Sequence, residues 1–128
     1  MRVTVEISPG ELLDKLAILE IKQDRITTPE QLANIGREKA ALEAAAGEEI
    51  SSSPDIIDLR SDIKAVNEEL WVIEDDIRLC ERDEDFGERF VTLARKVYLA
   101  NDRRAALKKQ INDLFGSDIA EEKSYAGR

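Results

Sequence analysis

The chain has 128 residues, of which 37% are charged and 5% aromatic, and its formal net charge at pH 7 is −9. This length suits one domain that buries a core without disulfides or metals, and the composition is typical of a helical bundle and not of a disordered chain. Binding to a nucleic-acid backbone requires an excess of Lys and Arg over the contact surface. The acidic balance therefore argues against a general nucleic-acid binder.

The inventory of reactive side chains is restricted. The chain has one cysteine, Cys80, and no histidine. This excludes an internal disulfide, Ser-His and Cys-His nucleophile pairs, and zinc sites of the usual kind. The three acidic residues at 74–76 point in three directions on a helix, so they cannot share one cation. We expect no metal site and no cofactor.

No segment favours membrane insertion or export. The longest strictly apolar run, residues 16–19, is too short to cross a bilayer, and the N-terminus lacks the basic start and apolar stretch of a signal peptide. We expect a cytoplasmic protein that forms a single helical domain over residues 1–128.

The N-terminus carries a strand signal. Residues 2–7 alternate between polar and apolar, with Val3, Val5 and Ile7 on one side, which predicts a short strand over residues 2–7. A lone strand cannot satisfy its own backbone. It must pair with the C-terminal tail, pair with the same strand of a second copy, or stay partly solvated.

Capping signals predict a first helix over residues 9–26. Ser8 is the expected N-cap, Pro9 suits the first helical position, and Glu11 closes a capping box. The apolar side chains of this helix point nearly all round its axis. It should therefore contact neighbours on more than one side.

Further helices follow in the same manner. A second helix is predicted over residues 29–46 and stops at Gly47, and its thin apolar face indicates packing on one side. A third is predicted over 54–82 and a fourth over 86–115. The tail, residues 117–128, has no helical stripe.

The third and fourth helices each carry a heptad seam. Their seam residues recur at alternating spacings of three and four, a period that keeps one stripe facing a partner helix. The short connection between the two helices makes them antiparallel. We therefore expect an all-α fold, an antiparallel helical bundle with a long coiled-coil-like hairpin. The seam residues are Ile56, Leu59, Ile63, Val66, Leu70, Ile73, Ile77 and Cys80, then Phe86, Phe90, Leu93, Val97, Ala100, Arg104, Leu107, Ile111 and Leu114.

Charge differs between these two helices. Residues 68–88 hold ten acids against two bases, whereas residues 95–110 hold six bases against one acid. One interpretation is that acids on one helix pair with bases on its antiparallel neighbour. The alternative is an anion site on a locally basic surface.

Arg104 is the one charged residue of the seams. Folding the hairpin about a turn near Glu84 places it within one helical turn of Asp62 and Glu69, and a buried guanidinium needs a partner. One of these acids, or Glu20 of the first helix, is the expected partner. In the alternative interpretation, basic and amide side chains between helices bind a phosphate or a carboxylate, with Arg104 acting bidentately. The candidate ligand-binding residues are Lys15, Glu20, Lys22, Asn101, Arg104, Lys108, Asn112, Lys123 and Tyr125.

Segments at both ends carry a resemblance. With ISPGELLDKL at residues 7–16, NDRR at 101–104 and EEKSY at 121–125, the chain resembles an uncharacterised bacterial family of small domains of unknown function. The resemblance covers nearly the whole chain. It implies a link to surface-polysaccharide and sugar-nucleotide work, and it gives no catalytic residues.

Three functions are consistent with these patterns. The first is a small cytoplasmic helical adaptor or ligand-binding module that forms a homodimer and has an anion site between the first and fourth helices. Its link to glycan or sugar-nucleotide metabolism would be a glycan-biosynthesis protein or a small anionic ligand. The second is a cofactor-free helical enzyme resembling a chorismate mutase, in which Arg and Lys side chains hold a dicarboxylate. The third is a structural coiled-coil spacer. No feature of the sequence requires catalysis.

Overall fold

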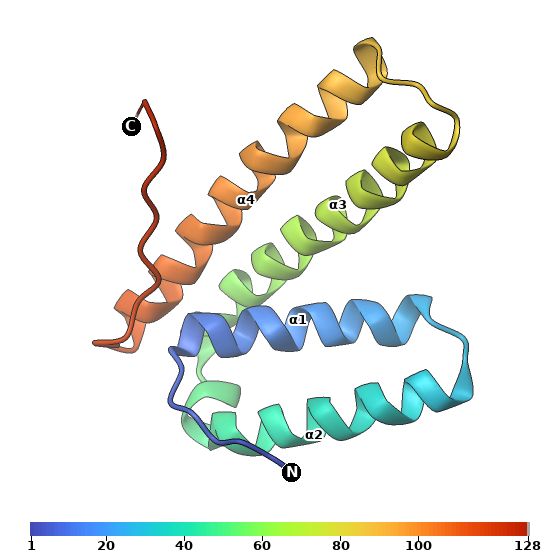
Figure 1. Ribbon diagram of the computed structural model, residues 1–128. Coiled ribbons are helices and arrows are strands. Elements are labelled where there is room, and N and C mark those ends of the chain that lie inside the picture. Colours follow the sequence, from blue (N-terminus) through green and yellow to red (C-terminus); the bar gives the residue numbers. More distant parts are fainter. Residues whose placement is uncertain (128) are drawn as a thin grey trace.

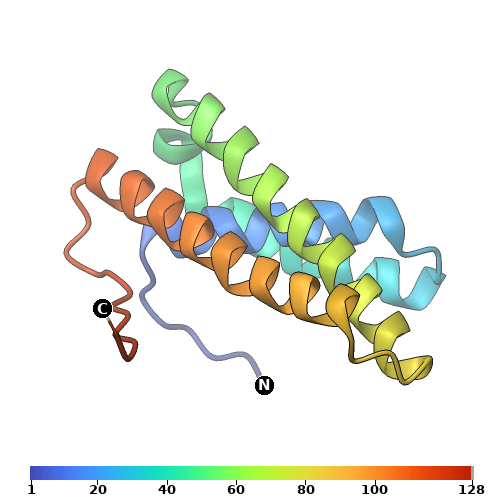
Figure 2. The same ribbon diagram turned by 90° about the horizontal axis from the view of Figure 1, so that it is seen from above.

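The computed structural model describes residues 1–127. Its elements are α1 (Pro9–Arg25), α2 (Pro29–Ser51), a short 3₁₀ helix η1 (Pro54–Ile56), α3 (Ile57–Arg82) and α4 (Glu88–Leu114). The helices form two hairpins, α1–α2 and α3–α4, which cross each other so that α1 contacts α2, α3 and α4 (Figures 1 and 2). This arrangement confirms the predicted all-α bundle, and it confirms that α3 packs closely against α4.

The first helix begins where its capping signals predict. The Ser8 hydroxyl oxygen accepts a hydrogen bond from the Glu11 amide at 3.1 Å, and Pro9 occupies the first turn. The Glu11 carboxylate, predicted to close a capping box, instead contacts Lys15 and Lys108. A side chain that a local motif assigns to the helix end is thus used in a tertiary contact.

A kink at Gly47 divides α2. Gly47 has φ 65°, a left-handed conformation that favours glycine. The predicted stop of the helix at this residue therefore has a structural counterpart, and one further helical turn follows to Ser51. Of the residues in α2, only Ile35 and Ala46 are buried, so this helix covers α1 from one side.

The core has two parts because α1 packs only against the half of the α3–α4 hairpin that lies away from its turn. The larger cluster joins both hairpins near the N-terminus of α1, and the smaller one lies within the α3–α4 hairpin toward its turn, where Figure 1 shows the hairpins apart. The larger cluster contains Leu12, Leu13, Leu16, Ala17, Ala46, Ile56, Ile63, Val66, Ala100 and Ile111, and the smaller one contains Ile73, Cys80 and Leu93.

The prediction of a strand over residues 2–7 is wrong. The described residues contain no strand, and residues 1–7 form an extended, exposed segment in which Val3 is 76% and Val5 70% exposed. The tail, with which a strand could have paired, runs back beside α4 instead (Figures 1 and 2). With no neighbouring strand in the described part of the chain to accept its hydrogen bonds, the segment has no partner for a sheet, and pairing with the tail does not occur.

No helix in the described part of the chain is both long and apolar enough to span a bilayer.

Candidate functional site

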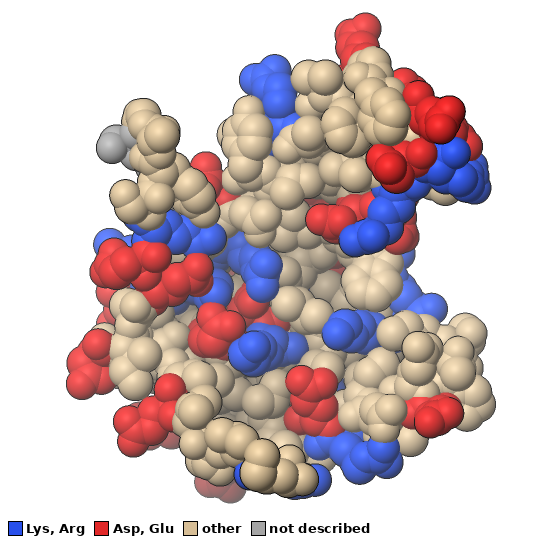
Figure 3. Space-filling model, in the orientation of Figure 1, with Lys and Arg blue, Asp and Glu red and all other residues tan. Residues whose placement is uncertain are grey.

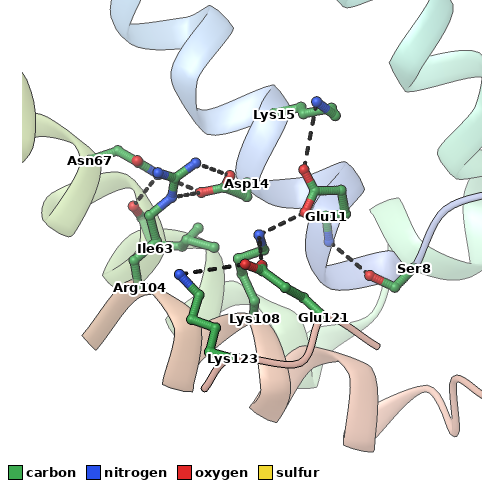
Figure 4. Close-up of polar contacts among 10 residues, drawn as sticks. All are labelled: Ser8, Glu11, Asp14, Lys15, Ile63, Asn67, Arg104, Lys108, Glu121 and Lys123. Atoms are coloured by element: carbon green, nitrogen blue, oxygen red, sulfur yellow. Dashed lines mark hydrogen bonds and ion pairs between the residues drawn. The ribbon is translucent and has the colours of Figure 1, made fainter. Parts of the chain in front are cut away.

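Arg104 forms a bidentate ion pair with Asp14 of α1. Its Nε donates to Asp14 Oδ1 at 2.8 Å and its Nη2 to Asp14 Oδ2 at 2.5 Å. The Asp14 side chain is 1% exposed and that of Arg104 is 28% exposed. The pair therefore joins α1 to α4 (Figure 4).

Asn67 of α3 completes the surroundings of Asp14. Its Nδ2 donates to Asp14 Oδ1 at 2.9 Å and to the Ile63 carbonyl oxygen at 3.0 Å. Burial raises the pKa of the Asp14 carboxyl, but the hydrogen bonds from Arg104 and Asn67 outweigh burial and hold this pKa below its ordinary value. Three helices thus converge on one ionised carboxylate.

The expected partners of Arg104 are not its partners. Glu69 instead binds the neighbouring Arg103, and Glu20 pairs with Arg60 and Lys64 of α3. The prediction named two acids of the adjacent hairpin helix and one acid of α1. Pairing of Arg104 with an acid is as predicted, but the acid is Asp14, a different residue of α1.

A second group of charges lies one turn further along α4. Lys108 Nζ is 2.6 Å from Glu11 Oε2 and 2.8 Å from Glu121 Oε2, and Lys123 Nζ is 3.4 Å from Glu121 Oε1 (Figure 4). The Lys108 side chain is only 11% exposed. Burial lowers the pKa of Lys108, but its hydrogen bonds to Glu11 and Glu121 outweigh burial and raise this pKa above the ordinary value.

These side chains border a small polar cavity, which we call the Lys108 cavity. Its volume is about 120 Å³. Figure 3 shows basic side chains gathered between the tail and the α1–α2 hairpin, with acidic ones beside them. The residues that line the Lys108 cavity are Asn101, Arg104, Ala105, Lys108, Glu121 and Lys123.

Two larger cavities adjoin it and share Asn101 with it. One, of about 580 Å³, lies between the tail and α4 and is lined by residues that include Tyr98, Lys123 and Tyr125. The other, of about 470 Å³, lies between the hairpins and is lined in part by Arg104 and Trp71. The small polar cavity thus opens toward spaces with apolar and aromatic walls.

Asn112 has a structural role at the start of α1. Its Oδ1 accepts a hydrogen bond from the Gly10 amide at 2.7 Å, so it satisfies a donor that the helix itself leaves unpaired. A Cβ on Gly10 would lie 2.4 Å from the Lys108 carbonyl oxygen and 2.8 Å from Asn112 Oδ1. The glycine therefore permits the close approach of α1 to α4 that places Glu11 beside Lys108.

The structure gathers some of the predicted site residues and separates the others. Asn101, Arg104, Lys108 and Lys123 line the Lys108 cavity, and Tyr125 lies in the adjoining cavity. The other four candidates lie outside both cavities. Lys15 pairs with Glu11, Glu20 binds α3, Lys22 lies in the last turn of α1, and Asn112 caps α1.

Four residues of the site were not among the candidates, namely Glu11, Asp14, Asn67 and Glu121. Glu11 was assigned to a local capping box. For Asp14, the signal was its position among the apolar residues of a helix that was expected to be covered on several sides, since such a position requires a buried partner. Glu121 lies in a tail with no periodic pattern, so periodicity gave no indication of its place.

Within residues 1–127, no group of three or more Cys, Asp or Glu side chains is placed to hold a metal ion. The arrangement can bind anions through ammonium and guanidinium groups, and it offers no nucleophile activated by a base.

Comparison with known proteins gives a family and no function. No curated protein and no solved structure matches the chain. Residues 3–128 match DUF6165, which is described as a family of unknown function. Because this match covers nearly the whole chain, the protein belongs to the DUF6165 family.

Proposed function

We propose that the protein is a small cytoplasmic helical adaptor or ligand-binding module that binds a phosphate or a carboxylate in the Lys108 cavity. The observation that carries this proposal is the position of the Glu121 carboxylate. It lies between the ammonium groups of Lys108 and Lys123, at 2.8 and 3.4 Å, in a cavity that Arg104 also borders. These groups are the usual partners of an anionic ligand.

The charge balance supports anion binding. The ion pairs around the cavity join three basic side chains to three acidic ones, and two of those acids, Asp14 and Glu11, belong to α1. The third, Glu121, belongs to the tail and its side chain is 45% exposed. With Glu121 elsewhere, these ion pairs would have one more base than acids, which favours an external anion. The six residues are Glu11, Asp14, Arg104, Lys108, Glu121 and Lys123.

The adjoining cavities support a ligand larger than inorganic phosphate. Both share Asn101 with the Lys108 cavity and have apolar or aromatic lining residues. An anionic group attached to a ring or to an apolar body fits this combination of a polar end and apolar walls. The link to glycan or sugar-nucleotide metabolism rests on the resemblance of the sequence segments, and a sugar nucleotide is one ligand of the right chemistry.

The alternatives have less support. An enzyme that resembles a chorismate mutase would hold a dicarboxylate with the same cations, and no contact in the site requires catalysis in addition to binding. A structural spacer accounts for the Arg104–Asp14 pair as a link between helices. It leaves the cavity and the position of the tail without a role.

A panel of ligands tests the proposal. Thermal unfolding is measured with phosphate, succinate and a sugar nucleotide such as UDP-glucose, against chloride at equal ionic strength. A ligand at one hundred times its Kd stabilises the native state by about 2.7 kcal/mol. We expect at least one anion to raise the melting temperature, and a panel with no effect on the parent protein would refute anion binding and favour the structural adaptor.

Matched variants locate the binding. Lys123→Met removes a cavity cation from the tail and leaves the helical core intact, so it should weaken binding without changing the fold. Lys109→Met is the control, because Lys109 is exposed and lies outside the lining of the cavity. Equal loss of binding in both variants would indicate a nonspecific effect of charge.

Self-association also belongs to this proposal. A homodimer was predicted from the apolar surface of the first helix and from a lone strand. In the structure α2, α3 and α4 cover α1, so the surface of this helix no longer supports a dimer. The exposed apolar residues of the N-terminal segment are the reason that remains for expecting self-association. Sedimentation equilibrium at tens of micromolar distinguishes dimer from monomer.

A further inference from the structure

The tail reaches the Lys108 cavity from outside the helical bundle. After α4 ends at Leu114, the chain reverses at Gly116, which has φ 63°, and runs back along α4 (Figures 1 and 2). Residues 118–127 are exposed and contain no helix. Within this exposed segment, the Glu121 carboxylate is held to α4 by the nearly buried ammonium group of Lys108.

The helical part of the network is complete without Glu121. Lys108 keeps Glu11 at 2.6 Å, and Arg104 keeps its bidentate pair with Asp14. Loss of the Glu121 contact therefore leaves no buried charge unpaired, and the fold does not depend on that contact. Glu121 is also the most exposed of the three acids, with 45% of its side chain exposed against 31% for Glu11 and 1% for Asp14.

We propose that the tail is an internal ligand, in which Glu121 occupies the anion position and must leave before an external phosphate or carboxylate binds. This inference rests on the proposed function. The contacts of Glu121 are those that a bound anion would make, two ammonium groups in a cavity bordered by Arg104 and Asn101. Its departure also frees Lys123, which lines both the Lys108 cavity and the adjoining cavity, to bind the external anion.

The consequence is a regulated site. An internal competitor lowers the apparent affinity for a ligand in proportion to the fraction of molecules whose site is open. Binding in turn displaces the Glu121 carboxylate from Lys108, while Lys123 stays at the cavity and binds the anion. A ligand therefore changes the position of an exposed segment, which suits an adaptor that presents this segment to a partner only in its ligand-bound state.

Glutamate-to-glutamine variants test this directly. Glu121→Gln keeps the size of the side chain and removes its charge, so the internal ligand is weakened while Lys108 and Lys123 remain. Loss of a partly exposed ion pair should raise the affinity for inorganic phosphate or succinate by roughly fivefold. Glu122→Gln is the matched control, since it removes the same charge from the adjacent exposed residue.

Two measurements decide the outcome. Calorimetric titration with phosphate and succinate should give tighter binding for Glu121→Gln than for the parent protein or Glu122→Gln. In amide NMR spectra, saturating anion should move the signals of residues 118–127 of the parent toward the positions seen in Glu121→Gln without ligand.

The result also separates the two proposals. If the parent binds an anion but Glu121→Gln binds it no more tightly than Glu122→Gln, or if the tail signals do not move, the tail is not an internal ligand and the anion site stands. If no anion binds to the parent or to Glu121→Gln, both proposals are overturned.

Discussion

Removal of the Asp14 carboxylate should destabilise the protein far more than removal of a surface carboxylate with the same kind of partner. Two neighbouring arginines of α4 provide the comparison. Arg104 binds Asp14 with an N–O distance of 2.5 Å, and Arg103 binds Glu69 at 2.6 Å. The pairs differ in burial, because the Asp14 side chain is 1% exposed and the Glu69 side chain is 46% exposed.

The magnitude follows from what each substitution leaves behind. Asp14→Ala removes two hydrogen bonds from Arg104 and one from Asn67. It leaves a guanidinium without its acid in a partly buried place, for which the expected cost is about 3 kcal/mol, the lower end of the range for a broken buried pair, because Arg104 is 28% exposed. Glu69→Ala breaks an exposed pair and should cost less than about 1 kcal/mol.

A double variant tests whether the instability of Asp14→Ala comes from the unpaired Arg104 guanidinium. Asp14→Leu with Arg104→Met removes both charges, and Asn67 keeps its hydrogen bond to the Ile63 carbonyl oxygen. Replacement of a whole buried pair by apolar residues is often neutral or stabilising, so the double variant should lie within about 1 kcal/mol of the parent.

The assay is urea unfolding followed by circular dichroism, with the free energy of unfolding extrapolated to water and the slopes compared. The reasoning is refuted if Asp14→Ala costs no more than Glu69→Ala. It is also refuted if the double variant is as unstable as Asp14→Ala, since the cost would then not come from an unpaired guanidinium.

Other perturbations have equally specific outcomes. Gly10→Ala places a Cβ 2.4 Å from the Lys108 carbonyl oxygen and should destabilise by about 1–3 kcal/mol, whereas Gly36→Ala, with nothing within 4 Å, should be neutral or stabilise by up to about 1 kcal/mol in urea unfolding. For pH dependence, the folded pKa of Asp14 lies below its ordinary value of 3.8, because hydrogen bonds outweigh burial. Its contribution is thus present above about pH 4 and is lost as the pH falls through the folded pKa. Melting temperatures of the parent should fall in this acid range, and those of Asp14→Asn should fall less steeply.

Local sequence determined the helices and their order. Ser8 and Pro9 supply the start of α1 through side-chain and dihedral effects that act within one turn, and the structure shows this cap. The heptad spacing of the two long helices showed that each packs against another helix. Because the connection between them is short, that other helix is the next one in the chain. These features depend on neighbours within a few residues or on one hairpin, so they could be predicted from the sequence.

Part of the candidate site was also readable from the sequence. Arg104 was recognisable because a charge on a heptad seam contradicts its surroundings, and Asn101 and Lys108 followed from their spacing on the same helix. Lys123 followed only from the EEKSY segment at residues 121–125, which carries part of the family resemblance, and no periodicity there indicates which way the chain runs. Its approach to Lys108 depends on the reversal of the tail at Gly116.

The tertiary structure alone decided how these elements meet. Asp14 and Arg104 are separated by 90 positions in the chain, and their contact depends on the crossing of two hairpins. That crossing is set by the packing of side chains and by the close approach at Gly10, where any Cβ would meet α4. The alternation of residues 2–7 carried a strand signal, but a strand exists only where another strand accepts its hydrogen bonds, and the fold places none beside it.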